Sequence, residues 1–383
     1  MHESNIAGLK TAPGVYTSDS VELFFADGRR VLRRFALHRG EGRQIARGFH
    51  REGDMERREF IGSMGALGGF FAVGGLAGGC RTVCSDGPLA AAQKTFEGRF
   101  EHERLSLGYH EVKIGLEKPF SILHISDTHL CAAYDDELPY DRRWARFRNS
   151  VFGGKQEEAL RDSLAWAKEN ADAVLHTGDL IDFQTQANFD LVRRYFGRAP
   201  DMFGCLGNHE FQRHKEGEPI RNTSEYNALS ADELRRVYRF DPELQSTVLG
   251  GVNFVAIEQV YGFVTASQVE RFHAEARKGL PIVLCMHAPI MTESIWRANS
   301  KFWPGCGKKY RADTVAAVRG DYKRQLEDKT TADFVAYLKM EPLLKAVLAG
   351  HLHIAVQDRL SPTAVEYVTG PNFLFAGQEI LFS

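Results

Sequence analysis

The sequence repeats one pattern five times: a short apolar run stops at a turn that carries aspartate, asparagine or histidine. The five turns are Ser126-Asp-Thr-His129, Gly178-Asp-Leu-Ile-Asp182, Gly207-Asn-His-Glu210, His287-Ala-Pro289 and Gly350-His-Leu-His353. Short apolar runs bounded by turn residues are typical of buried strands, and α/β proteins place their sites at the carboxyl ends of strands. The pattern therefore predicts strand ends that contribute to one site.

The first turn offers a carboxylate and an imidazole two residues apart, Asp127 and His129. Side chains two residues apart in a strand face the same side, so we expect both to emerge together at the carboxyl end of the strand. They make half a metal site, and the later turns supply the other half. Carboxylate, amide oxygen and imidazole suit zinc, manganese or iron and are poor ligands for copper(I).

The order of the five turns resembles the calcineurin-like metallophosphoesterase superfamily, from Asp127 to His353, with no ligand position missing. The resemblance implies an α/β fold with two mixed β-sheets packed face to face and flanked by helices. It implies one metal ion held by Asp127, His129, Asp179 and His353. It implies a second ion held by Asp179, Asn208, His287 and His351, with Asp179 as the bridge. The resemblance also implies that His209 does not bind metal and acts on the substrate instead.

These residues predict metal-dependent hydrolysis of phosphate monoesters or diesters. Two divalent or trivalent ions (manganese, iron or zinc) clamp the attacking and leaving oxygens, and a bridging hydroxide is the expected nucleophile. His209 would act as a general acid or stabilise charge, and Asp182 would orient a histidine or be an acid at a helix N-terminus. The alternatives are a nuclease on single-stranded nucleic acid and a catalytically silent metal-binding module.

Composition narrows the choice of partners. Hydrophobic residues make up 43% of the 383 residues, and the formal net charge is −2. The chain can bury a large core, but it has no global field that would attract nucleic acid or a membrane. We therefore expect a small phosphorylated substrate and do not expect nucleic acid as a partner.

The first 92 residues are unlike the remainder. Residues 1–54 are rich in Arg, Gly and His, with little periodicity beyond Val21–Ala26, and we expect them to be disordered. From Met55 the chain resembles a twin-arginine export signal, because Arg57 and Arg58 precede the uncharged, glycine-rich stretch Phe60–Gly79. Such a signal belongs at an amino terminus, so we expect translation to start at Met55 and residues 1–54 to come from a misassigned start.

Residues 55–92 would then be the signal segment and 96–383 the metallophosphoesterase domain. Cleavage at Ala90–Ala92, a membrane anchor over Phe60–Gly79 and lipid attachment at Cys80 all remain open. We expect export to the periplasm or the surface of a bacterial cell, with membrane contact only through this segment. Without a working signal the protein would be cytoplasmic.

Periodicity predicts several elements of the domain. The expected helices are Glu157–Asn170, Phe189–Phe196, Ser230–Tyr238 (capped by Ser-x-x-Glu), Thr265–Lys278 and Ala332–Lys339, and the expected strands include Val252–Ile257 and Thr363–Thr369. Insertions near 130–155 and 288–329 mix charged and aromatic residues, which favours either a substrate cap or solvated loops. Cys131 and Cys306 lie in these insertions, and a disulfide between them stays open.

Replacing Arg57 and Arg58 together by lysine tests the export hypothesis. The double variant should stay in the cytoplasm, as measured by cell fractionation, because a twin-arginine signal depends on the arginine pair. Arg81→Lys, beyond the apolar stretch, is the control and should be exported normally. Export of the double variant at the parent level would refute the twin-arginine interpretation.

Overall fold

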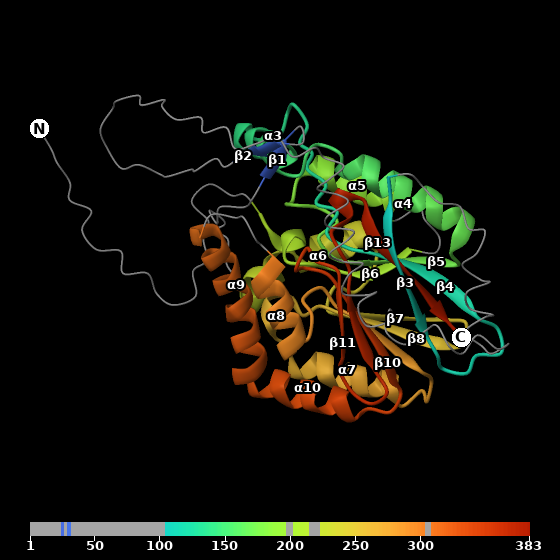
Figure 1. Ribbon diagram of the computed structural model, residues 1–383. Coiled ribbons are helices and arrows are strands. Elements are labelled where there is room, and N and C mark those ends of the chain that lie inside the picture. Colours follow the sequence, from blue (N-terminus) through green and yellow to red (C-terminus); the bar gives the residue numbers. More distant parts are fainter. Residues whose placement is uncertain (1–23, 27–28, 32–103, 197–201, 214–222, 303–307) are drawn as a thin grey trace, which may run out of the picture.

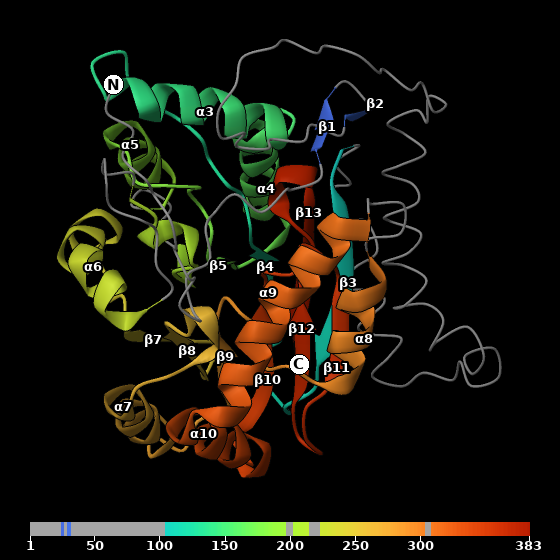
Figure 2. The same ribbon diagram turned by 90° about the vertical axis from the view of Figure 1, so that its left-hand side faces the viewer.

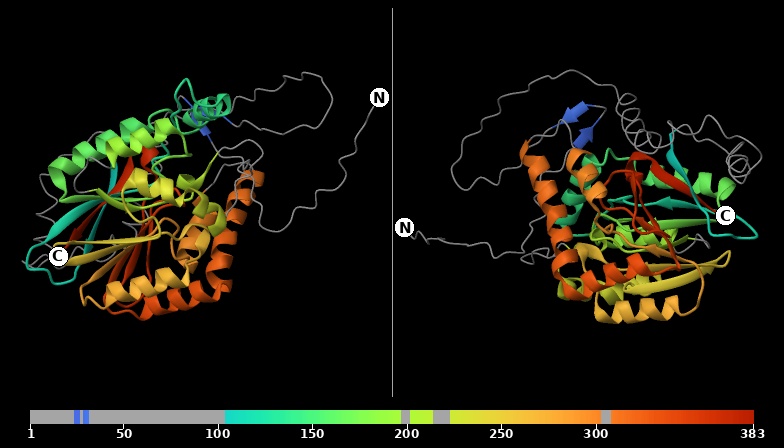
Figure 3. Two further views of the ribbon diagram at one scale, coloured as in Figure 1. Left: turned by 180° about the vertical axis from the view of Figure 1, so that it is seen from behind. Right: turned by 60° about the horizontal axis from the view of Figure 1, so that its bottom comes forward.

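A computed structural model describes residues 24–26, 29–31, 104–196, 202–213, 223–302 and 308–383 (Figure 1). Within these ranges two mixed β-sheets form the centre of the molecule and helices cover their outer faces (Figures 1 and 3). This is the predicted α/β fold. The expected signal segment and most of residues 1–54 lie outside the described residues, apart from the short antiparallel strands β1 (Phe24–Ala26) and β2 (Arg29–Val31).

The first sheet has five strands in the order β3-β13-β4-β5-β6. Their bounds are β3 Ser106–Val112, β4 Phe120–Ile125, β5 Ala173–Thr177, β6 Met202–Cys205 and β13 Ala376–Phe382. Strands β4, β5 and β6 run parallel, so their carboxyl ends lie at one edge. The C-terminal strand β13 is inserted between β3, to which it is parallel, and β4, to which it is antiparallel.

The second sheet has six strands in the order β11-β12-β10-β9-β8-β7. Their bounds are β7 Leu244–Leu249, β8 Val252–Ile257, β9 Ile282–Cys285, β10 Leu344–Ala349, β11 Val356–Arg359 and β12 Val365–Val368. The four inner strands are parallel, and the edge strands β7 and β11 are antiparallel to their neighbours. The parallel inner strands are nearly continuous apolar runs because both of their faces are covered.

Helices cover both outer faces (Figure 1). Leucines of α4 (Gln156–Asn170) and α6 (Ser224–Tyr238), with Val192 of α5 (Gln186–Tyr195), pack on the five-stranded sheet. Phenylalanines of α7 (Ala266–Ala276) and α10 (Lys329–Met340) pack on the six-stranded sheet. Helices α8 (Glu293–Phe302) and α9 (Lys308–Glu327) lie on the side that faces the viewer in Figure 2. The remaining elements are α3 (Pro139–Val151) and the 3-10 turns η1 (His209–Phe211), η2 (Val260–Gly262) and η3 (Asn372–Leu374).

A third apolar layer joins the inner faces of the two sheets. Phe120, Ile122 and Phe382 of the first sheet meet Phe254 and Leu348 of the second. Cys205 and Cys285 lie fully inside this layer, where a thiol packs as a small apolar group. Burial raises the pKa of both thiols, which keeps them protonated and unreactive.

Most predicted elements are confirmed, with bounds shifted by a few residues. The predicted start of a helix at Ser230 is wrong: α6 begins at Ser224, and Thr223 caps it by accepting a hydrogen bond from the Tyr226 N–H. The Ser-x-x-Glu pattern lies inside the helix, because the apolar face of α6 extends further back than the predicted element. The alternative of solvated loops is wrong where the insertions form helices, which are α3 in the first insertion and α8 and α9 in the second.

No helix of the described residues is long and apolar enough to cross a bilayer. The predicted apolar stretch Phe60–Gly79 lies outside those residues, as does Cys306. Cys131 is a buried thiol whose Sγ donates to the His129 carbonyl over 3.2 Å.

Phe382 tests how far the fold depends on the inserted last strand. Its ring is fully buried and stacks on Phe120 with ring centroids 5.1 Å apart. Phe382→Ala should lower the free energy of unfolding by roughly 3–5 kcal/mol, because it opens a cavity between the sheets. Urea unfolding of metal-free protein measures this. Leu326→Ala is the control, since Leu326 is 61% exposed, and a loss no larger than that of the control would contradict the packing described here.

Candidate metal centre

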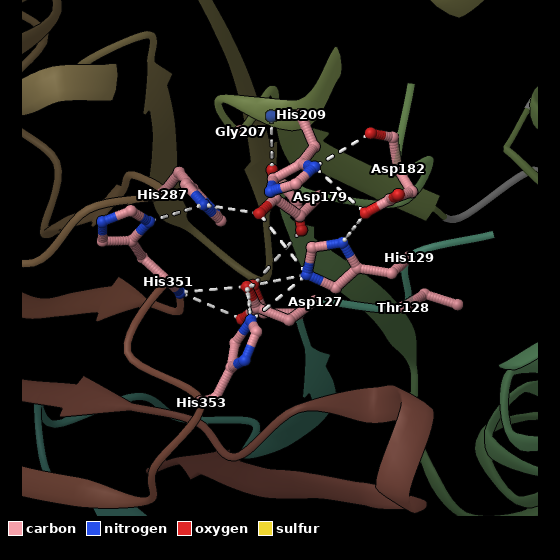
Figure 4. A network of polar contacts seen from close by, with 12 residues as sticks. Asp127, Thr128, His129, Asp179, Asp182, Gly207, His209, His287, His351 and His353 are labelled. Atoms are coloured by element: carbon pink, nitrogen blue, oxygen red, sulfur yellow. Dashed lines mark hydrogen bonds and ion pairs between the residues drawn. The ribbon is translucent and has the colours of Figure 1, made fainter. Parts of the chain in front are cut away.

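The five turns from the two sheets meet at one place (Figure 4). His129, after β4 of the five-stranded sheet, has its Nε2 3.2 Å from Nε2 of His353, after β10 of the six-stranded sheet. Asp179, after β5, has its Oδ2 3.2 Å from Nε2 of His287, after β9. The carboxyl ends of both sheets therefore converge on a single cluster.

The turns owe their shape to strained backbone. The expectation that Asp127 and His129 share a side because they alternate in a strand is wrong. Strand β4 ends at Ile125, and both residues have left-handed φ angles of 55° and 51°. Left-handed backbone is uncommon for residues other than glycine and persists where the surroundings enforce it. Seven described non-glycine residues have positive φ, and five of them are predicted ligands: Asp127, His129, Asp179, His351 and His353.

Motif glycines allow the turns to approach one another. A Cβ added at Gly207 would lie 2.2 Å from Oδ1 of Asp179, and one at Gly350 would lie 2.5 Å from Oδ2 of Asp127. Neither distance is tolerable for a carbon atom, so these positions exclude larger residues although their φ angles are ordinary. The glycines of the sequence motifs thus leave room for the carboxylates of the neighbouring turns.

Glu210 fastens two of the turns together. Its Oε2 accepts the N–H groups of Asp179 (2.9 Å) and Gly207 (2.7 Å), and its Oε1 accepts the N–H of Leu180 (2.7 Å) and the hydroxyl of Tyr238 (3.0 Å). This carboxylate is fully buried, and burial, followed by the charge of Asp179, raises its pKa despite these donors. Glu210 therefore holds backbone rather than the His209 ring.

Asp182 orients two histidines at once (Figure 4). Its Oδ1 accepts from Nδ1 of His129 (2.8 Å) and lies 3.0 Å from Nδ1 of His209. Since the Nδ1 atom of each ring carries the shared proton, Nε2 of each ring is free for other chemistry. The Arg148 guanidinium donates to both oxygens of Asp182, over 2.6 Å and 2.8 Å. Asp182 is thus the residue that contacts and orients the ring of His209.

His287 and His351 have a similar arrangement. Nδ1 of His287 donates to the carbonyl of Thr177 over 2.7 Å, so its Nε2 faces Asp179. That Nε2 lies 3.2 Å from Nδ1 of His351, whose Nε2 lies 3.2 Å from Oδ2 of Asp321. The backbone N–H of His351 also donates to the carboxylate of Asp127.

The site attracts positive charge. Burial would raise the pKa of Asp179, but His287 and His209 outweigh it and hold the pKa well below the usual value. Burial would lower the pKa of His209, but the charges of Asp179 and Asp182 outweigh it and raise this pKa to about 10. Burial would likewise lower the pKa of His287, but the charge of Asp179 outweighs it and raises this pKa to about 9. In the absence of metal, protons on these rings compensate the buried carboxylates, and bound cations would take over that role.

The donor set fits metal ions. Three groups have donor atoms close enough together to hold one: Asp127, His129 and His353; Asp127, Asp179 and His287; and His129, Asp182 and His209. The third group is better explained as a hydrogen-bond cluster, because Arg148 already supplies the positive charge beside Asp182. The other two contain predicted ligands only. Oδ1 of Asn208 is buried without a hydrogen-bond partner among the described residues, as expected of an oxygen kept for a cation.

Sequence reasoning missed two charged residues that contact this cluster. Arg148 lies in α3 of the first insertion and Asp321 in α9 of the second. Neither belongs to a motif, and no spacing relates them to their partners. Their only signal is that both occupy insertions that leave the ligand ends of strands. Two further histidines, His124 and His176, are buried within strands β4 and β5, and burial lowers the pKa of each to about 3.

Arg148→Met should lower the free energy of unfolding of metal-free protein by roughly 3–5 kcal/mol, because it leaves the buried charge of Asp182 without its ion-pair partner. Arg148→Lys should recover only part of the loss, since an ammonium cannot donate to both oxygens as a guanidinium does. Arg146→Met, exposed on the same helix, is the control and should change stability by less than about 0.5 kcal/mol. Equal stability of all three variants would show that the pair contributes nothing.

No curated protein matches the sequence. Similar solved structures include a dimetal phosphatase from Danio rerio (14% identity, 68% of this chain and 91% of that chain, TM-score 0.35). They also include the phosphopantetheinyl hydrolase PptH from Mycobacterium tuberculosis (13%, 67% and 91%, TM-score 0.34) and the calcineurin-like phosphoesterase YfkN from Bacillus subtilis (13%, 67% and 82%, TM-score 0.33).

The family comparison is the decisive one. The sequence model described as calcineurin-like phosphoesterase matches residues 120–355. This match covers more than half of the chain, begins at the first residue of β4 and ends two residues past His353, so it includes all five turns. The chain therefore belongs to the calcineurin-like phosphoesterase family.

Proposed function

We propose that this protein hydrolyses small phosphate esters at a dinuclear metal centre held by Asp127, His129, Asp179, Asn208, His287, His351 and His353. One observation carries the proposal. The Asp179 carboxylate lies between the two groups of histidines, with its Oδ2 3.6 Å from Nε2 of His129 and 3.2 Å from Nε2 of His287. A carboxylate between two sets of nitrogen donors is suited to bridge two cations.

Metal ions bound there would activate water and neutralise the charge of the phosphate. The residues of the chain have separate tasks. Asp182 and Thr177 fix the tautomers of His129 and His287, so that each ring presents Nε2 to the centre. Glu210 and the strained turns keep the carboxylates in place before substrate arrives.

His209 is the proposed proton donor. Its backbone N–H donates to Oδ1 of Asp179 over 2.9 Å, which holds the residue at the edge of the centre. Its Nδ1 is engaged by Asp182, so Nε2 is the atom that would donate a proton to the leaving oxygen. An unactivated ester leaves as an alkoxide and needs that proton.

The first insertion supports an anionic substrate. A pocket of about 230 Å³ lies between α3 and the loop that follows His129, and its polar lining consists of Arg142, Arg146 and Asn149 together with one carboxylate, Asp135. Guanidinium groups suit phosphate and carboxylate oxygens. We propose that this pocket receives a second anionic group of the substrate. Export of the protein stays a proposal, supported by the Arg57-Arg58 pattern alone.

Assays of metal-loaded protein test the proposed activity. The panel should contain an aryl phosphomonoester, a bis-aryl phosphodiester, cyclic nucleotides and single-stranded DNA, with bound metal counted by elemental analysis. Ester hydrolysis that disappears with metal removal and returns with metal supports the proposal. If the protein binds about two ions per chain but hydrolyses none of these substrates, the proposed activity is wrong and the catalytically silent metal-binding module remains.

His209→Ala separates the proton donor from the metal ligands. We expect kcat for an unactivated ester to fall by about 10²–10⁴-fold with metal content unchanged. The loss should shrink for a nitrophenyl ester, whose leaving group needs no proton. Equal losses on good and poor leaving groups would exclude the general-acid role and leave charge stabilisation. Loss of metal would make His209 a ligand.

A further inference from the structure

Helix α9 presents two buried polar side chains on one face. Asp321 and Gln325 lie four residues apart, so they project from the same side of the helix, and they are only 9% and 5% exposed. Val318, one turn earlier on that side, packs in the apolar layer beneath the six-stranded sheet. A helix from an insertion thus directs polar groups inward, where burial without partners would be costly.

Gln325 holds the loop that follows His287. Its Nε2 donates to the carbonyl of Pro289 over 2.7 Å, and its Oε1 accepts the N–H of Met291 over 3.0 Å. Between these two, the N–H of Ile290 donates to the buried carboxylate of Glu366 over 2.7 Å. Three consecutive residues of the loop are therefore fixed by side chains, beginning two residues after a predicted metal ligand.

Asp321 contacts the other histidine of the same predicted site. Its Oδ2 lies 3.2 Å from Nε2 of His351. A carboxylate accepts the proton of Nε2, which leaves a lone pair on Nδ1, the atom that faces Nε2 of His287. Arg324 forms an ion pair with Asp321 from one turn further along, and a Cβ at Gly262 would lie 2.4 Å from the Asp321 carbonyl. Asp321 is thus fixed by its own helix and by η2.

We propose that Asp321 and Gln325 are positioning residues for the second metal site, with Asp321 selecting the His351 tautomer that binds metal through Nδ1. The second insertion is then a structural part of the metal centre and not only a border of the substrate site. This inference rests on the dinuclear centre proposed above. It adds two residues that belong to none of the five turns.

Titration of metal-free, full-length protein with Mn²⁺ tests the inference, with calorimetry to give affinities and EPR to separate a coupled Mn²⁺ pair from a single ion. Asp321→Ala should weaken the second ion by about 10–100-fold, the usual cost of losing a partner of a ligand histidine, while the first ion binds normally. Asp321→Asn keeps an acceptor for Nε2 and should lose less. Gln325→Ala should also weaken the second ion alone.

Glu327→Gln is the matched control, because Glu327 is a carboxylate of the same helix with a side chain that is 65% exposed, and among the described residues it is paired with Lys323 on the surface. It should bind both ions as the wild type does. Urea unfolding of each metal-free variant identifies a merely structural effect. Such an effect would lower the free energy of unfolding equally in Asp321→Asn and Asp321→Ala, because both lose the ion pair with Arg324. The two variants would then bind Mn²⁺ with the same affinity.

Two outcomes would overturn this inference and leave the dinuclear centre intact. In the first, wild type and Asp321→Ala bind two Mn²⁺ ions with equal affinities. In the second, Asp321→Ala binds both ions more weakly to the same degree, with a matching loss of stability. Wild-type protein that binds a single Mn²⁺ ion would instead overturn the dinuclear centre, and this inference with it. A spin-coupled pair in the wild type that becomes a single-ion signal in Asp321→Ala, and stays coupled in Glu327→Gln, is the expected result.

Discussion

Everything at this site depends on burying the carboxylate of Asp179 where two sheets meet. An ionised carboxylate in a protein interior is costly unless hydrogen bonds and positive charge surround it. The backbone N–H of His209 and the Nε2 of His287 approach the two oxygens of Asp179 from opposite sheets. The carboxylate of Glu210 accepts the backbone N–H of Asp179. The left-handed backbone at Asp179, with a φ of 56°, is the conformational cost of pointing this group inward.

The sequence contains enough information to predict the fold and the centre of the site, because short local patterns of residues indicate both. Apolar runs reveal buried strands, and parallel strands place their carboxyl ends at one edge, so Asp127 and Asp179 are expected together without knowledge of distances. The backbone at these residues could not be predicted in the same way. Alternation in a strand suggested a shared side for Asp127 and His129, whereas the real arrangement uses consecutive turns joined by hydrogen bonds from His129 N–H to the Asp179 carbonyl.

The residues of the insertions that contact the ligands could not be predicted from the sequence. Arg148 and Asp321 each meet a motif residue through a contact that depends on where a whole helix packs, and sequence spacing holds no record of that. Arg148 stabilises the charge that orients His129 and His209, and Asp321 faces His351 from the other side of the centre. The groups that support the ligands of this chain are therefore set by how its two insertions pack, and not by the five turns themselves.

The position of β13 has a consequence for the order in which the molecule assembles. This strand follows all the other described strands in the sequence, yet it lies between β3 and β4, and Phe382 pairs with Phe120 across most of the length of the chain. Contacts of such long sequence separation form slowly because a large loop must close first. While the chain emerges from the ribosome, β4 can pair with β5 but has an open edge on its other side. The turn bearing Asp127 and His129 directly follows β4, so we expect it to reach its final form only after β13 has been made and inserted, and we expect metal capture to follow that step.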